Sequence, residues 1–438
     1  MDLSSLIKKA GVVGAGGAGF PTHVKAGSKV EFVLANGAEC EPLLHKDFEL
    51  MLLKAKEMVE GMALMIEATG AKKGYFGIKS KNAAAIEVVK SQIGNHPIEI
   101  TELGDFYPSG DEYELVYTAT KRLIPAGGIP LNVGCVVNNV ETLMNIQHAA
   151  QEKPVTEKFI CVAGTVKKPS SFFVPVGTTA REVIELAGGS SESEFAVFNG
   201  GLMMGKLMEN LEEPVTKTTG GFIVLPKKHH LVFRMSQPES SWHRIGKSAC
   251  DQCSYCTEFC PRYLLGYDVQ PHKVMRSLGF TSSGAGYWNQ MAELCCSCGL
   301  CTLYACPEEL FPKEACDQSK RNMRIEGVKY VQKHPVKVHP MKEGRRVPLK
   351  MLMKKLKVQY LAADTPFIDV NYQPKEVKIK LKQAVGDASL PVVRLRDRVA
   401  KGDLIAQIPE GKLGSNIHAS ISGTIIDINN DFIRIINN

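Results

Sequence analysis

Two compact groups of cysteines constrain this sequence more than any other feature. The first group is Cys250, Cys253, Cys256 and Cys260, and the second is Cys295, Cys298, Cys301 and Cys306. Each group ends in Cys-Pro, and its first three members are separated by two residues. Thiolates are the soft ligands of iron–sulfur clusters, and this spacing wraps one short loop around a cluster. Such pairs also suit zinc, but the doubled three-cysteine pattern favours two [4Fe–4S] clusters.

The cysteine before each proline is expected to serve the other cluster. In two-cluster ferredoxins, the fourth cysteine of such a run ligates the second cluster. By resemblance to that pattern, one cluster is assigned to Cys250, Cys253, Cys256 and Cys306, and the other to Cys295, Cys298, Cys301 and Cys260. The second group is irregular, because four residues rather than three separate Cys301 from Cys306. Cys296 is an alternative to Cys295, which we favour because it keeps the regular spacing.

The composition indicates a multidomain protein of a reducing compartment. The chain has 438 residues, 13 cysteines and a net charge of +7. Disulfides are rare in the cytosol, so the other cysteines are predicted to be buried small residues: Cys40, Cys135, Cys161 and Cys316. The sequence contains neither a long uncharged apolar run nor a signal peptide, which predicts a cytoplasmic protein without a transmembrane segment. It has no nucleic-acid-binding motif.

The order of helical and strand-like segments predicts a multidomain α/β and α+β protein. Residues 1–155 alternate between the two types, which favours an α/β domain with a mainly parallel sheet. The other predicted units are a β-rich domain at 156–235, the cysteine-rich helical domain at 240–330, a linker at 331–374 and a β domain at 375–438. Because most of the positive charge lies between Lys313 and Lys357, we interpret the linker as basic and solvated rather than as a docking surface for an acidic protein.

A glycine-rich loop precedes the first predicted strand. Its glycines are Gly14, Gly16, Gly17 and Gly19. Such a loop offers backbone N–H groups to a phosphate, although its spacing is not that of the dinucleotide-binding fingerprint. The run from Asn36 to Glu41 follows a predicted strand, at the sheet edge where α/β proteins bind ligands.

Two runs identify a family resemblance. Gly-Gly-Ala-Gly-Phe-Pro-Thr at 16–22 and Asn-Asn-Val-Glu-Thr at 138–142 resemble the flavin domain shared by the NADH-binding subunit of respiratory complex I and the Rnf-complex C subunit. The resemblance implies FMN as a cofactor and NADH as the electron donor. It assigns the four glycines to the FMN phosphate region, with Lys25 nearby, and it assigns further flavin contacts to Asn36, Asn138, Asn139 and Thr142.

The same resemblance assigns acidic residues to the nicotinamide side of the site. Glu39, Glu41 and Glu112 match residues that line the flavin–nicotinamide pocket, and Phe20 is expected to stack there. Ala38 stands where the complex I pattern has Asp. Some contacts to the flavin or to NADH are therefore expected to differ from those of complex I.

The remaining modules also resemble known domains. Residues 157–221 resemble the β-grasp (SLBB) domain of these families, and Met203 and Met204 within it are predicted to pack. Residues 240–330 are expected to form a two-cluster ferredoxin-like helical domain. The C-terminal residues resemble the barrel-sandwich hybrid of biotinyl and lipoyl carriers. The modified lysine of those carriers is absent, so a structural or docking role is expected. His418 is predicted to be a residue of a solvent-facing turn rather than an axial ligand.

The order of these modules suggests a subgroup. Rnf C subunits place the barrel-sandwich module first, whereas here it is last. This order and the Cys-Pro-Glu-Glu-Leu run at 306–310 resemble the cobalamin reductases of propanediol-utilisation microcompartments. The resemblance implies an NADH-dependent reductase that lowers cob(III)alamin toward cob(I)alamin inside a bacterial microcompartment. An adenosyltransferase and a shell protein are the implied partners.

Two other functions fit the same motifs. One is an Rnf-like module that exchanges electrons between NADH and ferredoxin or flavodoxin, or regenerates NAD. The other is a non-enzymatic, electron-conducting scaffold that docks a shell protein. The apolar stripe of Leu3, Leu6 and Ile7 is predicted to be a packed first helix rather than an encapsulation helix.

Overall fold

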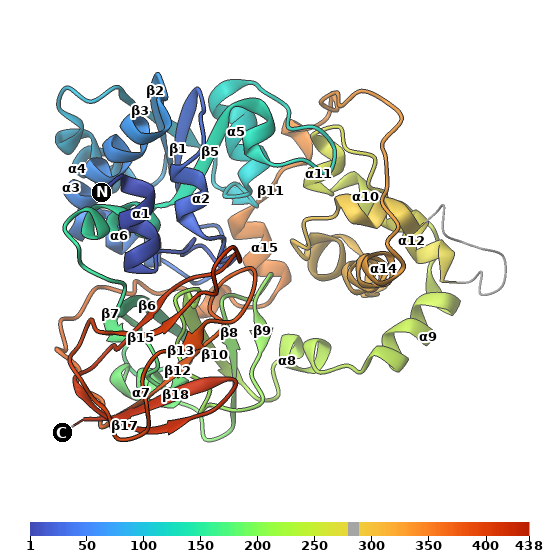
Figure 1. Ribbon diagram of the computed structural model, residues 1–438. Coiled ribbons are helices and arrows are strands. Elements are labelled where there is room, and N and C mark those ends of the chain that lie inside the picture. The colour runs from blue at the N-terminus through green and yellow to red at the C-terminus, as the bar shows by residue number, and fades with distance from the viewer. Residues whose placement is uncertain (279–288, 438) are drawn as a thin grey trace.

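The computed structural model describes residues 1–278 and 289–437. They form an N-terminal α/β module, a β-grasp module, a cysteine-rich helical module and a C-terminal β module. In Figure 1 the cysteine-rich helices lie to one side of the N-terminal module, and the C-terminal strands lie against the β-grasp module. This multidomain α/β and α+β architecture is the predicted one.

The N-terminal module is built on a parallel sheet, as predicted. Its four strands have the order β3-β2-β1-β5. Val33 and Ala35 of β1 point to one face of the sheet and Leu34 points to the other, because side chains alternate along a strand. Helices α1, α3, α4 and α6 cover the first face and α5 covers the second, so both faces are buried.

Local sequence explains how these helices begin and end. Asp2 caps α1 by accepting from the Ser5 N–H, and Gly11 ends the helix in a left-handed conformation. Ile7 of α1 is fully buried, so this helix is packed, as predicted. The elements are α1 (Leu3–Ala10), α2 (Thr22–Ala26), β1 (Phe32–Gly37), α3 (Lys46–Thr69), β2 (Lys73–Lys79), α4 (Ala83–Ile93), β3 (Ile98–Leu103), β4 (Phe106–Tyr107), α5 (Glu112–Thr120), η1 (Pro130–Val133), β5 (Cys135–Asn139) and α6 (Val140–Ala150).

The β-grasp module is a five-stranded mixed sheet with the order β7-β6-β10-β8-β9. Strands β6 and β10 are parallel, and the other neighbours are antiparallel. Helix α7 packs on one face and begins with a capping box of Thr179 and Glu182. The elements are β6 (Glu157–Gly164), β7 (Ser170–Pro175), α7 (Ala180–Leu186), β8 (Phe195–Asn199), β9 (Lys206–Leu207) and β10 (Gly221–Pro226).

The cysteine-rich module is helical over the residues that the structure describes. Its helices are short, because the chain repeatedly turns around the cysteine positions. The elements are α8 (His230–Met235), α9 (Glu239–Ala249), α10 (Tyr255–Glu258), α11 (Pro261–Leu264), α12 (Pro271–Ser277), η2 (Met291–Leu294), η3 (Cys301–Ala305) and α14 (Pro312–Glu326).

The segment predicted as a solvated linker, 331–374, is instead packed over part of its length. Strand β11 pairs with β4 of the N-terminal module, and α15 follows it. Leu349, Leu352 and Leu356 are buried between the β-grasp and cysteine-rich modules. Lys342 is 4% exposed and pairs with Glu114 at 2.7 Å. Composition missed this packing because the partners are distant in sequence. The elements are η4 (Glu343–Arg345), β11 (Val347–Pro348), α15 (Leu349–Lys355) and η5 (Gln359–Leu361).

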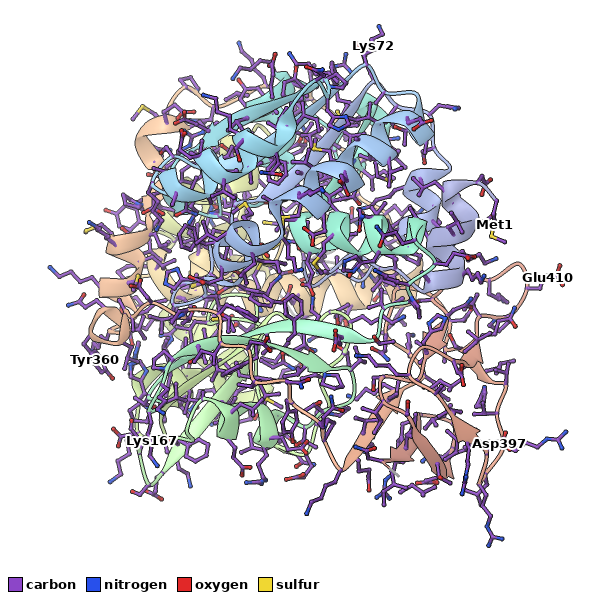
Figure 2. The ribbon with its side chains drawn as sticks, turned by 90° about the vertical axis from the view of Figure 1, so that its left-hand side faces the viewer. Met1, Lys72, Lys167, Tyr360, Asp397 and Glu410 are labelled. Carbon is purple, nitrogen blue, oxygen red and sulfur yellow. The ribbon has the colours of Figure 1, made fainter. Side chains whose placement is uncertain are left out.

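The C-terminal module consists of two small sheets that enclose one apolar core. Their strand orders are β12-β18-β17-β14 and β13-β15-β16. Figure 2 shows this module, where Asp397 and Glu410 are labelled, beside the β-grasp module, where Lys167 is labelled. The strands are β12 (Glu376–Lys380), β13 (Leu390–Pro391), β14 (Arg398–Val399), β15 (Leu404–Gln407), β16 (Ile417–His418), β17 (Gly423–Ile428) and β18 (Phe432–Ile436).

A buried lysine joins three modules. Lys217 Nζ donates to the carbonyl oxygens of Gly11 and Asn416, both at 2.7 Å, and to Ser415 Oγ at 3.1 Å. His418, predicted in a solvent-facing turn, is buried in the same region on β16. That prediction was wrong because the C-terminal module docks with this strand turned inward.

Within residues 1–278 and 289–437, no helix combines the length and apolar character that a membrane-spanning segment needs.

Candidate cofactor sites

The glycine-rich loop lies at the carboxyl edge of the parallel sheet. Gly14 N–H donates to the Phe20 carbonyl at 2.9 Å, which closes the loop. Ala15 N–H donates to Thr142 Oγ1 at 2.9 Å, and a Cβ on Gly16 would lie 3.3 Å from Asn139 Cβ. Gly17 has a φ of +103° and faces open space. The loop therefore approaches the end of β5 closely while leaving backbone groups available to a ligand.

The asparagines at the strand ends have different environments. Asn36 Nδ2 donates to the Gly110 carbonyl at 2.8 Å, and Asn139 Nδ2 donates to Asp47 Oδ2 at 2.8 Å. Asn138 is 2% exposed, and neither polar atom of its amide has a partner among the described residues. Buried polar groups are normally hydrogen-bonded, so an unpartnered amide at this edge fits contact with a bound group.

Lys25 and Phe20 lie close to each other. Lys25 Nζ donates to the Val137 carbonyl at 2.6 Å and lies 5.8 Å from the centre of the Phe20 ring. Burial lowers the pKa of Lys25, and the Glu112 carboxylate partly offsets this effect. Glu112 itself is exposed at the start of α5. The structure thus brings together Phe20, Lys25 and Glu112, as the resemblance implies.

The other two acidic residues are engaged by protein groups. Glu39 accepts from the Asp47 N–H at 3.0 Å, and burial next to the Asp47 carboxylate raises the pKa of Glu39 to about 7. Glu41 accepts from the N–H groups of Met203 and Met204, both at 2.9 Å, and burial raises its pKa to about 7. Glu41 therefore binds the β-grasp loop, and its assignment to the flavin–nicotinamide pocket stays a prediction. In that loop Met203 is buried, as predicted, but Met204 is exposed.

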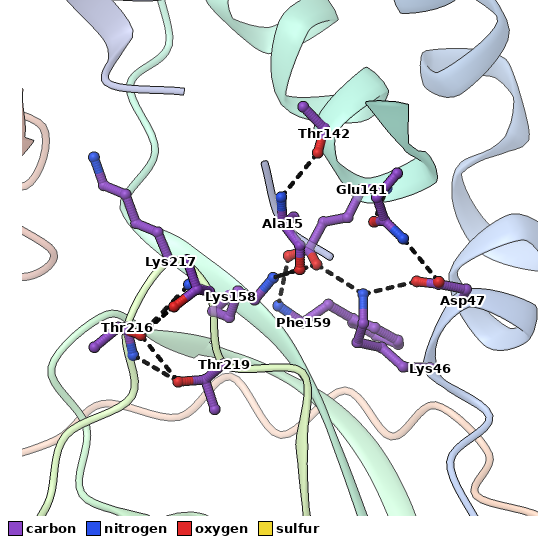
Figure 3. Close-up of polar contacts among 12 residues, drawn as sticks. Ala15, Lys46, Asp47, Glu141, Thr142, Lys158, Phe159, Thr216, Lys217 and Thr219 are labelled. Carbon is purple, nitrogen blue, oxygen red and sulfur yellow. Dashed lines mark hydrogen bonds and ion pairs between the residues drawn. The ribbon is translucent and has the colours of Figure 1, made fainter. Parts of the chain in front are cut away.

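A buried network of charged side chains contacts the glycine-rich loop through the carbonyl of Ala15 (Figure 3). Glu141 lies between two lysines: Lys158 bonds to its Oε2, and Lys46 Nζ is 2.9 Å from the same oxygen. Lys158 also donates to the Ala15 carbonyl at 3.3 Å, and Lys46 pairs with Asp47 at 2.7 Å. No motif pointed to either lysine. The only sequence feature that could have indicated a buried partner was the charged Lys158 at the start of a largely apolar strand.

The cysteines of the first group gather around one pocket in the crossed arrangement. Cys250, Cys253 and Cys256 line it together with Cys306 of the second group. Burial raises the pKa of Cys256 to about 12, and the other three thiols of the pocket add to the shift. Bound iron would replace these protons, because a coordinating thiol is deprotonated.

The remaining predicted ligands form a second, more buried group. Burial raises the pKa of Cys260, and the neighbouring thiols of Cys296 and Cys295 raise it further. Cys298 and Cys301 are also within electrostatic range of Cys260. The neighbours of each thiol are thus compatible with the crossed partition, and the assignment of these thiols as cluster ligands stays a prediction.

A π-helical turn accommodates the irregular spacing of the second group. Residues Cys301–Ala305 form this turn, which ends at Cys306. A π turn takes up one extra residue, and such turns are frequent at functional sites. The additional residue is thereby absorbed, and Cys306 still reaches the first pocket.

Two further thiols adjoin the second group. Cys316 of α14 is a neighbour of Cys295, and Cys296 is a neighbour of Cys298. Cys316 is buried, as predicted. The preference for Cys295 over Cys296 as a ligand stays a prediction, because both sulfurs lie in this group.

The second group adjoins the N-terminal module, and the first group lies nearer the surface. The Tyr107 hydroxyl donates to the Cys298 carbonyl at 2.7 Å, and a Cβ on Gly299 would lie 2.8 Å from the Met203 carbonyl. In the first group, Cys253 is exposed. The second group therefore contacts the N-terminal module, and the first group is closer to solvent.

Family comparisons agree with this architecture. Residues 7–148 match the Nuo51 FMN-binding domain, and residues 159–206 match the SLBB domain. Residues 249–311 match a 4Fe-4S dicluster domain, and residues 355–435 match the RnfC barrel sandwich hybrid domain. The protein is thus built from FMN-binding and iron–sulfur modules.

Whole-chain relatives decide the family. Cobalamin reductase PduS of Salmonella typhimurium is 37% identical over 437 residues, covering 99% of this chain and 96% of the relative. The Citrobacter freundii protein of the same name is 37% identical over 432 residues, covering 98% and 95%. This chain belongs to the PduS family. A component of the proton-translocating ferredoxin:NAD(+) oxidoreductase complex of Clostridium ljungdahlii is 32% identical, over 60% of this chain and 56% of that component. As a PduS-family member, the protein is a flavin and iron–sulfur oxidoreductase.

Asn138 offers a test of the flavin site that separates binding from folding. We expect Asn138→Leu to weaken FMN binding by about tenfold to a hundredfold, because a hydrogen-bonding group is lost. The stability of the FMN-free protein should stay unchanged or rise, since the buried amide has no partner among the described residues. FMN titration by fluorescence and urea unfolding measure the two quantities.

The neighbouring asparagine provides the contrast. Asn139→Leu removes the bond to Asp47 and the cap on the Glu141 N–H, so both FMN affinity and stability should fall. Equal FMN affinity in Asn138→Leu and the wild type would contradict the assignment of Asn138.

Proposed function

We propose that this protein is an NADH-dependent reductase that delivers single electrons to cob(III)alamin, lowering it toward cob(I)alamin. The observation that carries the proposal is the order of the cysteine groups, with the Cys260 group in contact with the N-terminal module and Cys253 of the other group exposed to solvent. Bound FMN would accept a hydride from NADH, and bound clusters would conduct single electrons. Corrin as the acceptor is supported by the name of the two relatives that match nearly the whole chain.

The residues have distinct parts in this proposal. The loop glycines Gly14, Gly16, Gly17 and Gly19 leave room for the phosphate region of FMN. Asn36, Asn138, Asn139 and Thr142 orient the flavin, and Lys25 with Phe20 and Glu112 borders the side open to NADH. Glu39 and Glu41 hold the surrounding loops. Two [4Fe–4S] clusters are assigned to Cys250, Cys253, Cys256 and Cys306, and to Cys260, Cys295, Cys298 and Cys301.

An anaerobic assay tests the acceptor. Protein reconstituted with FMN, iron and sulfide is mixed with NADH and hydroxocobalamin, and the corrin spectrum is followed. We expect loss of the cob(III)alamin bands at a rate proportional to protein concentration. An unchanged spectrum, with flavin and iron contents intact and flavin reduced by NADH, would remove cobalamin from the proposal.

A second candidate is electron exchange between NADH and ferredoxin or flavodoxin. It is favoured by the likeness of 60% of this chain to a component of a ferredoxin:NAD(+) oxidoreductase complex. NADH-dependent ferredoxin reduction without corrin turnover would select it. Flavin that NADH does not reduce would point instead to a conducting scaffold, which the Ala38 departure makes worth testing.

The cobalamin proposal also includes partners and location. An adenosyltransferase would consume cob(I)alamin, and a shell protein would hold both enzymes in a microcompartment. Addition of an adenosyltransferase and ATP to the assay should yield adenosylcobalamin. Accumulation of unmodified reduced corrin would argue against this coupling.

A further inference from the structure

A buried arginine links the second cysteine group to the N-terminal module. Arg262 lies in α11, two positions after Cys260, and is 7% exposed. Its Nη2 donates to Asp111 Oδ2 at 2.8 Å. The guanidinium carbon lies 3.4 Å from the centre of the Tyr113 ring, so the guanidinium group stacks on this ring.

Part of this guanidinium has no partner. Nε and Nη1 are buried and make no hydrogen bond to any residue in the described part of the chain. A guanidinium has five N–H donors, and leaving donors of a charged group unpaired in the interior is costly. The Cys296 thiol lies beside the guanidinium, and the backbone N–H groups of Arg262 and Tyr263 are directed at the Cys260 thiol.

The negative charge next to Arg262 is the carboxylate of Asp111, which belongs to the N-terminal module. Asp111 caps α5, because its Oδ1 accepts from the Tyr113 N–H at 3.0 Å and the Glu114 N–H at 3.3 Å. Asn36 Nδ2 donates a hydrogen bond to the carbonyl oxygen of Gly110, the residue before Asp111. One carboxylate therefore both holds the flavin-side loop and orients the arginine.

We propose that Arg262 is a positioning residue that donates through Nε and Nη1 to the sulfur atoms of the cluster held by the Cys260 group, raising its reduction potential. This inference rests on the cluster assignment of the proposed function. Hydrogen bonds to sulfur and nearby positive charge both stabilise the reduced cluster. Asp111 reduces this effect, because its negative charge opposes that of the arginine.

Redox titration followed by electron paramagnetic resonance tests the proposal on the reconstituted full chain. Cys298→Ser identifies the signal of the Cys260-group cluster by its loss. In Arg262→Gln, the ratio of reduced to oxidised cluster at a fixed potential should fall about tenfold, equivalent to about 59 mV for a one-electron couple. Asp111→Asn, which preserves a good helix cap, should shift the ratio in the opposite direction. The other cluster should change little in both variants.

A matched control separates this role from general packing. Arg234 is equally buried and lies over the Phe311 ring, and Nε is its one buried donor atom without a partner among the described residues. Its Nη2 donates to the carbonyl groups of Thr302 and Leu310, and its Nη1 pairs with Glu309 at 3.4 Å. Arg234→Gln should leave the potential of the Cys260-group cluster unchanged. If Arg262→Gln and Asp111→Asn shift the potential in the same direction, or neither shifts it, the proposal is overturned.

Failure of cluster assembly has a different meaning in Arg262→Gln and in the wild type. If Arg262→Gln cannot assemble the cluster, Arg262→Lys and Asp111→Asn decide the question. Arg262→Lys should lower the potential, since the charge is kept but the planar donor fork is lost. An unshifted potential in both variants would overturn the proposal. Failure of the wild-type protein to assemble any cluster would refute the cluster assignment itself.

Discussion

Glu141→Gln is expected to destabilise the protein by about 3–5 kcal/mol, the cost of breaking a buried ion pair by removing one partner. Glu141 is 1% exposed, and its carboxylate is shared by Lys46 and Lys158. A glutamine can accept hydrogen bonds but cannot balance two buried ammonium groups. Lys158 also bonds to Ala15, so its displacement should release the glycine-rich loop and lower FMN retention.

Denaturant unfolding followed by circular dichroism, together with flavin content, measures both effects. Glu152→Gln is the control, because Glu152 pairs with Lys9 on the surface with side chains 64% and 60% exposed. Exposed pairs contribute at most about 1 kcal/mol. An equally small loss in Glu141→Gln would show that the network is not structurally important. Combined with Lys158→Met, Glu141→Gln should cost less than the sum of the two single changes, because the charges are coupled.

Replacing the two Cys-Pro cysteines one at a time should remove clusters in the crossed order. Cys306→Ser should abolish the cluster of the first pocket, although Cys306 belongs to the second group by sequence. Cys260→Ser should abolish the other cluster. Each variant should retain about half of the iron and sulfide, since each cluster needs four protein ligands.

Paramagnetic resonance spectra of further variants identify which cluster is lost. The Cys306→Ser spectrum should match that of Cys253→Ser, and the Cys260→Ser spectrum should match that of Cys298→Ser. Cys135→Ala is the control, because Cys135 lies in β5, away from both groups, and should keep full iron content. A match between Cys306→Ser and Cys298→Ser would contradict the crossed assignment.

The agreement between sequence and structure is greatest where chemistry demands a local pattern. Cysteine spacing predicted three ligands of each cluster, because three corners of a cluster can be bound from one short loop, and the resemblance to two-cluster ferredoxins implied the crossed fourth ligand. The resemblance of the glycine-rich run implied a site at which the structure brings Phe20, Lys25 and Glu112 together. Strand-like runs at 31–35 and 74–78 predicted two strands of the parallel sheet.

The expectations that failed concern residues whose surroundings come from distant parts of the chain. Lys342 was predicted to be solvated with the rest of the basic stretch, yet its partner Glu114 lies 228 residues away. His418 was predicted to face solvent and is buried by docking.

The sequence by itself indicated iron–sulfur chemistry through the spacing of its cysteines, which is a local property of the chain, and flavin chemistry through the resemblance of its glycine-rich and Asn-Asn-Val-Glu-Thr runs. It could not determine how the sites are connected. The Lys46–Glu141–Lys158 network, the unpartnered amide of Asn138 and the unpaired donors of Arg262 arise only when modules pack and exclude water. Burial decides whether a charge or an amide needs a partner, and burial is a property of the tertiary structure alone.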